Sequence, residues 1–179
     1  DIVNYSEESM LKALKDKGLE VEEGMNRNRM TDSMWKYVRS SISGPAFLVN
    51  HPMFVSPLAK SKEENQNITE RFQVIIAGSE LGNGYSEIND PQDQLMRFLE
   101  QQKLRESGDE EAQMLDIDFV EMLEYGMPPV SGYGQSERVF WFLENITARE
   151  GTLFPQMKPE LEQSTKKIYK DILPKVKKK

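Results

Sequence analysis

Three carboxylates, two asparagines and a tyrosine lie within one short segment of this chain, residues 78–91 with the sequence GSELGNGYSEINDP. In a ligand site, carboxylates commonly hold a divalent cation through hard oxygen ligands or pair with an ammonium group. A strand this polar is rarely built for a hydrophobic core. The alternative is an edge strand that its charges keep soluble. Composition alone leaves both interpretations open.

The residues before this segment predict a β-hairpin. Residues 72–76 (FQVII) form a β-type apolar run, and Ala77-Gly78 suits a tight two-residue turn. The chain should therefore return antiparallel from Ser79, with Glu80 opposite Ile75.

The polar side chains of the returning strand should share a face. Asn83, Tyr85 and Glu87 alternate onto one face, with Gln73 expected opposite Gly82 on the neighbouring strand. Strict alternation puts Glu80 on the other face. The sequence Gly-Asn-Gly at residues 82–84 favours a β-bulge, which would bring Glu80 toward the same cavity.

Composition sets broad limits. The chain has 179 residues, enough for one domain with its own core, and it has no cysteine, which excludes disulfides and thiol nucleophiles. With a single histidine, His51, a histidine-based metal cluster cannot form within the chain, and the following proline makes His51 a loop residue rather than a general base. We expect no membrane span and a cytoplasmic location.

Charge is unevenly distributed. The net charge is −7, yet the segment from residue 166 onward carries seven lysines and one aspartate. The acidic body is a poor match for phosphate backbones, and we interpret the basic end as a solvated tail.

Helical patterns surround the hairpin. Residues 1–17, capped by Ser6, and residues 31–42 predict two helices before it. Asp90-Pro91 starts another helix, and residues 116–125 form a short one.

A second group of functional residues lies in PPVSGYGQSER at residues 128–138. Gly132 and Gly134 would let the backbone approach a flat ligand. Ser136 can cap the following apolar helix, whose apolar surface on all sides predicts burial. Arg138, one turn inside, could stack on an aromatic base and reach phosphate oxygens, or pair with the adjacent Glu137.

Four segments in this order, FVSPLAK, GSELGNGYSEINDP, GMPPVSGYGQSER and AREGTLFPQMK, closely resemble class II lysyl-tRNA synthetases, over residues 47–158. The resemblance implies an α+β fold, an antiparallel β-sheet flanked by helices that forms part of a class II catalytic core. It also implies that residues 1–163 are the C-terminal portion of that domain, in which 1–44 form a helical segment and 45–158 the sheet and active-site half. Residues 164–179 would then be a basic tail.

The resemblance also implies roles for individual residues. Glu80 matches a magnesium-binding glutamate that helps hold ATP. Asn83, Tyr85 and Glu87 match the lysine pocket: the asparagine near the amino-acid backbone, the ring along the aliphatic chain and the glutamate toward the ε-ammonium. The remaining ATP-binding and catalytic positions are Gly132, Gly134 and Arg138 of the third class II motif.

Three departures from the family pattern stand out. Gln73 occupies the position of a second metal-binding glutamate, so its part in holding Mg²⁺ is in question. GYGQSER is one residue shorter than the usual glycine-rich run. Nothing resembles the first two class II motifs or the anticodon-binding barrel, so we expect a fragment that is not fully active alone.

The implied function is activation of L-lysine with ATP and Mg²⁺ to lysyl-adenylate, followed by transfer to tRNA(Lys), in a homodimeric parent. Two alternatives remain: a synthetase-like paralogue that ligates an amino acid to a protein, and a non-catalytic module that binds lysine or a nucleotide.

Overall fold

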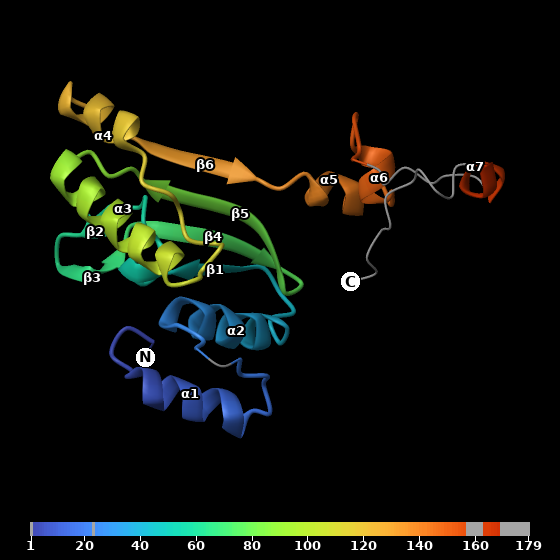
Figure 1. Cartoon of the computed structure of the whole chain (residues 1–179), viewed down its shortest axis with the longest axis horizontal. Helices are drawn as coiled ribbons and strands as arrows, with labels where there is room; N and C mark the ends of the chain where they lie inside the picture. Colours follow the sequence, from blue (N-terminus) through green and yellow to red (C-terminus); the bar gives the residue numbers. More distant parts are fainter. Residues whose placement is uncertain (1, 23, 157–162, 169–179) are drawn as a thin grey trace. The chain divides into compact units, whose positions relative to one another are not determined.

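The computed structural model describes residues 2–22, 24–156 and 163–168. It divides into two compact units, Asp1–Val139 and Phe140–Lys179, and Figure 1 shows the elements of each. The expected α+β architecture is confirmed: the first unit contains an antiparallel sheet with helices packed beside it.

The sheet has four strands in the order β1-β4-β5-β6, and each neighbouring pair is antiparallel. A separate two-stranded sheet pairs β2 with β3. The bounds are Ala46–Val49 for β1, Ser61–Lys62 for β2, Asn65–Thr69 for β3, Arg71–Ile76 for β4, Ser79–Ser86 for β5 and Ser131–Gln135 for β6.

The predicted hairpin is present between β4 and β5. Ala77 and Gly78 both have positive φ, 48° and 70°, as a tight turn of the primed type requires. Glu80 pairs with Ile75, as expected from this turn.

The bulge is present one residue earlier than predicted. Ile75 pairs with Glu80 while Val74 pairs with Gly82, so Leu81 is the extra residue. Gln73 therefore pairs with Asn83, and the predicted pairing of Gln73 with Gly82 is wrong.

The other face of the hairpin explains this position. A side chain at Gly84 would meet Phe72 ring atoms at 2.7 and 2.8 Å, and one at Gly82 would meet the Tyr133 ring. The Phe72 and Tyr133 rings stack with centroids 5.8 Å apart. Regular pairing through residues 82–85 keeps Gly82 and Gly84 under these rings. The extra residue of the bulge, Leu81, therefore precedes the two glycines.

Two helices precede the sheet, α1 (Glu7–Asp16) and α2 (Arg27–Arg39). Ser6 caps α1 as predicted, and its hydroxyl accepts a hydrogen bond from the Ser9 N–H. The second helix begins four residues before the predicted start because Asn26 caps it. Met10, Leu14 and Met30 form the core between the helices, and Figure 1 shows α2 between α1 and the sheet.

A 3₁₀ turn, Met53–Val55, follows β1, and α3 (Pro91–Glu106) and α4 (Ile117–Glu124) follow the hairpin. Asp90 caps α3 as predicted. Arg97 of α3 is buried, where it binds Asp93 and donates to the Ala59 carbonyl oxygen and the Ser61 hydroxyl. It thereby anchors the chain that leads into β2.

The helix after β6, α5 (Arg138–Leu143), spans the boundary of the two units, and α6 (Ala148–Gly151) and α7 (Gln163–Ile168) follow. The predicted burial of α5 is wrong: Phe142 is 84% exposed, because no described residue covers its apolar surface. The domain boundary at residue 163 stays a prediction, and residues 169–179 of the basic tail lie outside the described part.

Within the described ranges, no helix combines the length and the apolar character needed to cross a membrane.

Candidate functional site

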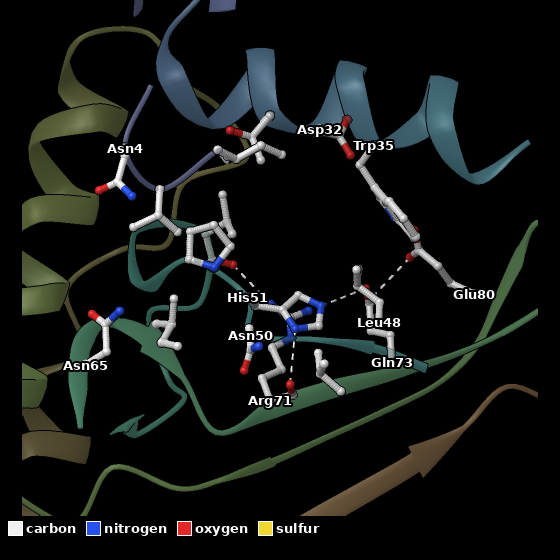
Figure 2. A pocket seen from close by; sticks show the side chains of 17 residues that line it. Asn4, Asp32, Trp35, Leu48, Asn50, His51, Asn65, Arg71, Gln73 and Glu80 are labelled. Carbon is white, nitrogen blue, oxygen red and sulfur yellow. Dashed lines mark hydrogen bonds between the residues drawn. The ribbon is translucent and has the colours of Figure 1, made fainter. Parts of the chain in front are cut away.

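The bulge brings the predicted site residues to one face of the sheet. Antiparallel partners point to the same side, so Glu80, Asn83 and Tyr85 share a face with their partners Ile75, Gln73 and Arg71. The prediction that Glu80 joins the other polar side chains on this face is thus confirmed. The predicted common cavity is not found: the cavity that Glu80 lines is not lined by Asn83, and Tyr85 and Glu87 line a different one. Arg71, Gln73 and Glu80 line a cavity of about 700 Å³ between the sheet and α2 (Figure 2).

Helix α2 and strand β4 hold the Glu80 carboxylate from two sides. The Trp35 indole N–H donates to Glu80 Oε1 at 2.6 Å, and the Gln73 amide donates to Oε2 at 3.2 Å. Arg39 Nη1 lies 3.8 Å from the same carboxylate. The orientation of the Glu80 carboxylate is therefore fixed. Figure 2 shows Trp35 and Gln73 beside it.

His51 lies in the loop after β1, as predicted, but its side chain is only 7% exposed. Its Nε2 lies 3.0 Å from Gln73 Oε1 and its Nδ1 lies 3.2 Å from the Arg71 carbonyl oxygen. Burial outweighs these hydrogen bonds and lowers the pKa of His51 below its ordinary value of 6.5. The ring supports Gln73 from the side opposite Glu80 (Figure 2).

Tyr85 and Glu87 continue the row beyond Asn83. Burial raises the pKa of the Tyr85 hydroxyl, with a further contribution from the charge of Glu87. Burial also raises the pKa of the Glu87 carboxyl above 4.5. The Tyr85 hydroxyl and the Glu87 carboxylate thus lie near one another, and both are partly shielded from water. A cationic ligand would be a favourable partner for Glu87 here.

The neighbouring strand β6 leaves this face open. Gly134 pairs with Asn83 and Gly132 pairs with Tyr85, so both glycines lie on the face that carries the polar row. A side chain at Gly134 would meet nothing within 4 Å, and one at Gly132 would meet only Glu87 Oε1, at 3.8 Å. A flat group can therefore approach the backbone here.

Arg138 is the first residue of α5, which follows this open strand, so its predicted place one turn inside the helix is wrong. Its backbone N–H donates to the Ser136 hydroxyl at 3.3 Å, which agrees with the predicted cap, and its side chain is exposed. The structure thus places Arg138 in the first turn of the helix that follows β6.

The family model of class II tRNA synthetases (D, K and N) matches residues 3–158. The chain belongs to this family. Among its relatives, the lysine–tRNA ligase of Thermotoga maritima is 46% identical over 162 residues, which cover 89% of this chain and 32% of the relative. The lysine–tRNA ligase of Thermosipho africanus is 47% identical over 161 residues, covering 89% and 32%.

A lysine–tRNA ligase from Christiangramia forsetii matches 95% of this synthetase chain at 40% identity over 178 residues, which is 31% of the relative. The chain thus spans about a third of the length of the curated relatives it matches.

The residues of this class II chain fit Mg²⁺ at one position. Glu80 makes two hydrogen bonds through its side-chain oxygens, and an ionised carboxylate has about four acceptor sites, so capacity for a cation remains. Gln73 turns its amide N–H to Glu80 and its oxygen to His51, so it does not face the same point as a ligand. In the described ranges, no three acidic or histidine side chains form a metal cluster.

Three residues of the site were missed by sequence reasoning. Trp35 falls within the helix predicted over residues 31–42, His51 is predicted as a loop residue, and Arg71 lies just before the apolar run 72–76. Alternation along β4 puts Arg71 on the same face as Gln73 and could have identified it. No local signal pairs Trp35 with Glu80, because they lie 45 positions apart.

Proposed function

We propose that this chain forms the amino-acid site and part of the ATP site of a lysine–tRNA ligase. The observation that carries the proposal is the bulge at Leu81, which gathers Glu80, Asn83 and Tyr85 on one face beside the open backbone of β6. The lysine–tRNA ligases at 40–47% identity support the choice of lysine as substrate.

In this proposal Glu87 pairs with the ε-ammonium of lysine, Tyr85 lies along the aliphatic chain, and Asn83 contacts the amino-acid backbone. The raised pKa of the Glu87 carboxyl comes from burial, and an ammonium partner would offset that desolvation. Tyr85 and Glu87 are two positions apart in extended backbone, so the ring and the carboxylate point to the same side. The pocket therefore has an apolar wall and a polar end.

On the ATP side, Gly132 and Gly134 offer the flat surface for the adenine, and Arg138 stacks on the base and reaches the phosphates. Glu80 is the carboxylate that would hold Mg²⁺, and Gln73 is at most an indirect support. Magnesium, when bound with ATP, would neutralise phosphate charge.

The proposed reaction has two steps. The lysine carboxylate attacks the α-phosphorus of ATP, so that a carboxyl–phosphate bond forms, the α–β phosphoanhydride bond breaks and pyrophosphate leaves. A terminal ribose hydroxyl of tRNA(Lys) then attacks the carbonyl of lysyl-adenylate and AMP leaves. Positioning and charge stabilisation carry such chemistry, so the site needs no histidine base.

The relatives are about three times longer than the chain, so the proposal assigns full aminoacylation to the parent enzyme, a cytoplasmic homodimer that binds tRNA(Lys). The chain alone is proposed to bind lysine without completing the reaction.

Calorimetric titration of the chain with L-lysine tests this proposal. We expect binding by the wild type and its loss in Glu87→Ala, because the ammonium loses its charged partner. Glu100→Ala, which removes an exposed carboxylate of α3, is the matched control and should bind as the wild type does. Absence of lysine binding in all three proteins would refute the proposed site.

A further inference from the structure

Arg71 begins β4 on the face that carries the polar row, opposite Tyr85 and next to Gln73. Its side chain lines the cavity shown in Figure 2 together with Gln73 and Glu80. A partly buried arginine is costly to desolvate, and burial lowers the pKa of Arg71. The structure must therefore hold it there through specific contacts.

Two sets of hydrogen bonds fix the guanidinium group. Nη1 donates to the Val55 carbonyl oxygen at 3.0 Å and to the Ser56 hydroxyl at 3.1 Å, and both belong to the segment after β1. Nε donates to Asn83 Oδ1 at 2.9 Å. The planar group is therefore held in one orientation from both sides.

The contact with Asn83 also determines how that amide is turned. An arginine side chain can only donate, so Asn83 must present its carbonyl oxygen to Arg71 and its NH₂ group away from it. The orientation of an asparagine amide is otherwise ambiguous, and here the donor-only partner decides it. Asn83 is thus presented to a ligand as a hydrogen-bond donor.

The charge of Arg71 has no direct counterpart. Within residues 2–22, 24–156 and 163–168, no carboxylate lies within ion-pair distance of it. Arg71 Nη2 and Asn83 Nδ2 make no hydrogen bond to any residue in these ranges. The guanidinium and the amide, which are hydrogen-bonded to each other, thus each keep a donor for a ligand, and such donors beside an uncompensated positive charge are suited to an anionic group.

We propose that Arg71 recognises the α-carboxylate of the amino-acid substrate, acting with the amide that it orients on Asn83. This inference rests on the proposed lysine site and adds a residue to it. A carboxylate and a phosphate share the required chemistry. We assign the carboxylate because Arg71 lies opposite Tyr85 and bonds Asn83, the two residues proposed to hold the body of the amino acid.

Calorimetry with L-lysine and with cadaverine, which is lysine without its carboxylate, tests this assignment. Arg71→Gln should weaken lysine binding by about 10- to 100-fold, as expected for loss of a charge-assisted hydrogen bond, and leave cadaverine binding unchanged. Arg29→Gln removes a half-exposed arginine paired with Glu22 and is the matched control, with both affinities unchanged. ATP is titrated in parallel.

The affinities of Arg71→Gln for lysine, cadaverine and ATP distinguish the possible roles of Arg71. Equal weakening of lysine and cadaverine by Arg71→Gln would show a structural role and overturn the inference, as would unchanged lysine binding. Weaker ATP binding with unchanged lysine binding would assign the cation to a phosphate instead. Absence of both lysine and cadaverine binding in the wild type would refute the proposed function itself.

A second variant covers the case in which Arg71→Gln does not fold. Arg71→Lys keeps a cation at this position but lacks the planar fork that reaches Asn83 and the ligand together. The ratio of lysine affinity to cadaverine affinity should fall in this variant, and an unchanged ratio would overturn the inference.

Discussion

The indole nitrogen of Trp35 lies 2.6 Å from Oε1 of Glu80, so α2, the helix that directly precedes the sheet in the chain, fixes a carboxylate 45 positions further on. We expect Trp35→Phe to lower the free energy of unfolding by about 1 kcal/mol, since a hydrogen bond to a partly exposed charged group is lost.

A double-mutant cycle with Glu80→Ala, which removes the acceptor, isolates this contribution. Denaturant titration of the four proteins should give a coupling energy of the same sign and size. Additive effects of the two substitutions would show that the contact contributes nothing to stability.

Gly84 packs directly beneath Phe72, and its missing side chain leaves room for the ring. In Gly84→Ala the new methyl group would meet ring atoms at 2.7 and 2.8 Å and the Gly132 carbonyl oxygen at 3.0 Å. We expect a loss of about 1–3 kcal/mol in the free energy of unfolding, because the backbone of β6 must shift. Gly134→Ala, on that same strand with nothing within 4 Å, is the control and should change stability by less than about 0.5 kcal/mol.

The single histidine gives the stability a measurable pH dependence. Burial lowers the pKa of His51 in the folded chain, so the unfolded chain binds a proton at a higher pH than the folded chain does. Stability should therefore be complete above the ordinary pKa of 6.5 and decrease as the pH falls below it.

Denaturant titrations at several pH values, compared with His51→Gln, check this dependence. The variant should lose less stability between neutral pH and mildly acidic pH than the wild type. NMR titration of the only histidine ring should give a pKa below 6.5. A value above 6.5 would contradict the prediction.

Lysine binding should itself depend on pH through Glu87. Burial raises the pKa of the Glu87 carboxyl above 4.5, whereas an ammonium ligand requires the ionised form. Lysine affinity should therefore rise as the pH increases through and just above 4.5 and then level off, with release of a proton on binding in that range.

Calorimetry in two buffers of different ionisation enthalpy measures this proton release. Glu87→Gln has no carboxyl group at this position and should release no proton there. Identical pH profiles for the two proteins would exclude Glu87 as the partner of the ammonium.

The sequence by itself determined the elements whose causes are local. The hairpin turn follows from Ala77-Gly78, and the start of α3 follows from the cap of Asp90 before Pro91. Four segments in their order, among them the polar segment 78–91 and the glycine-rich segment before Arg138, also indicated the synthetase family.

Only the tertiary structure decided how the site is assembled. The bulge falls at Leu81 because Phe72 and Tyr133 cover Gly82 and Gly84 on the far face. The contacts of Trp35 with Glu80 and of His51 with Gln73 join residues 45 and 22 positions apart. Such contacts depend on how helices and strands pack, and neither alternation nor helical periodicity encodes them.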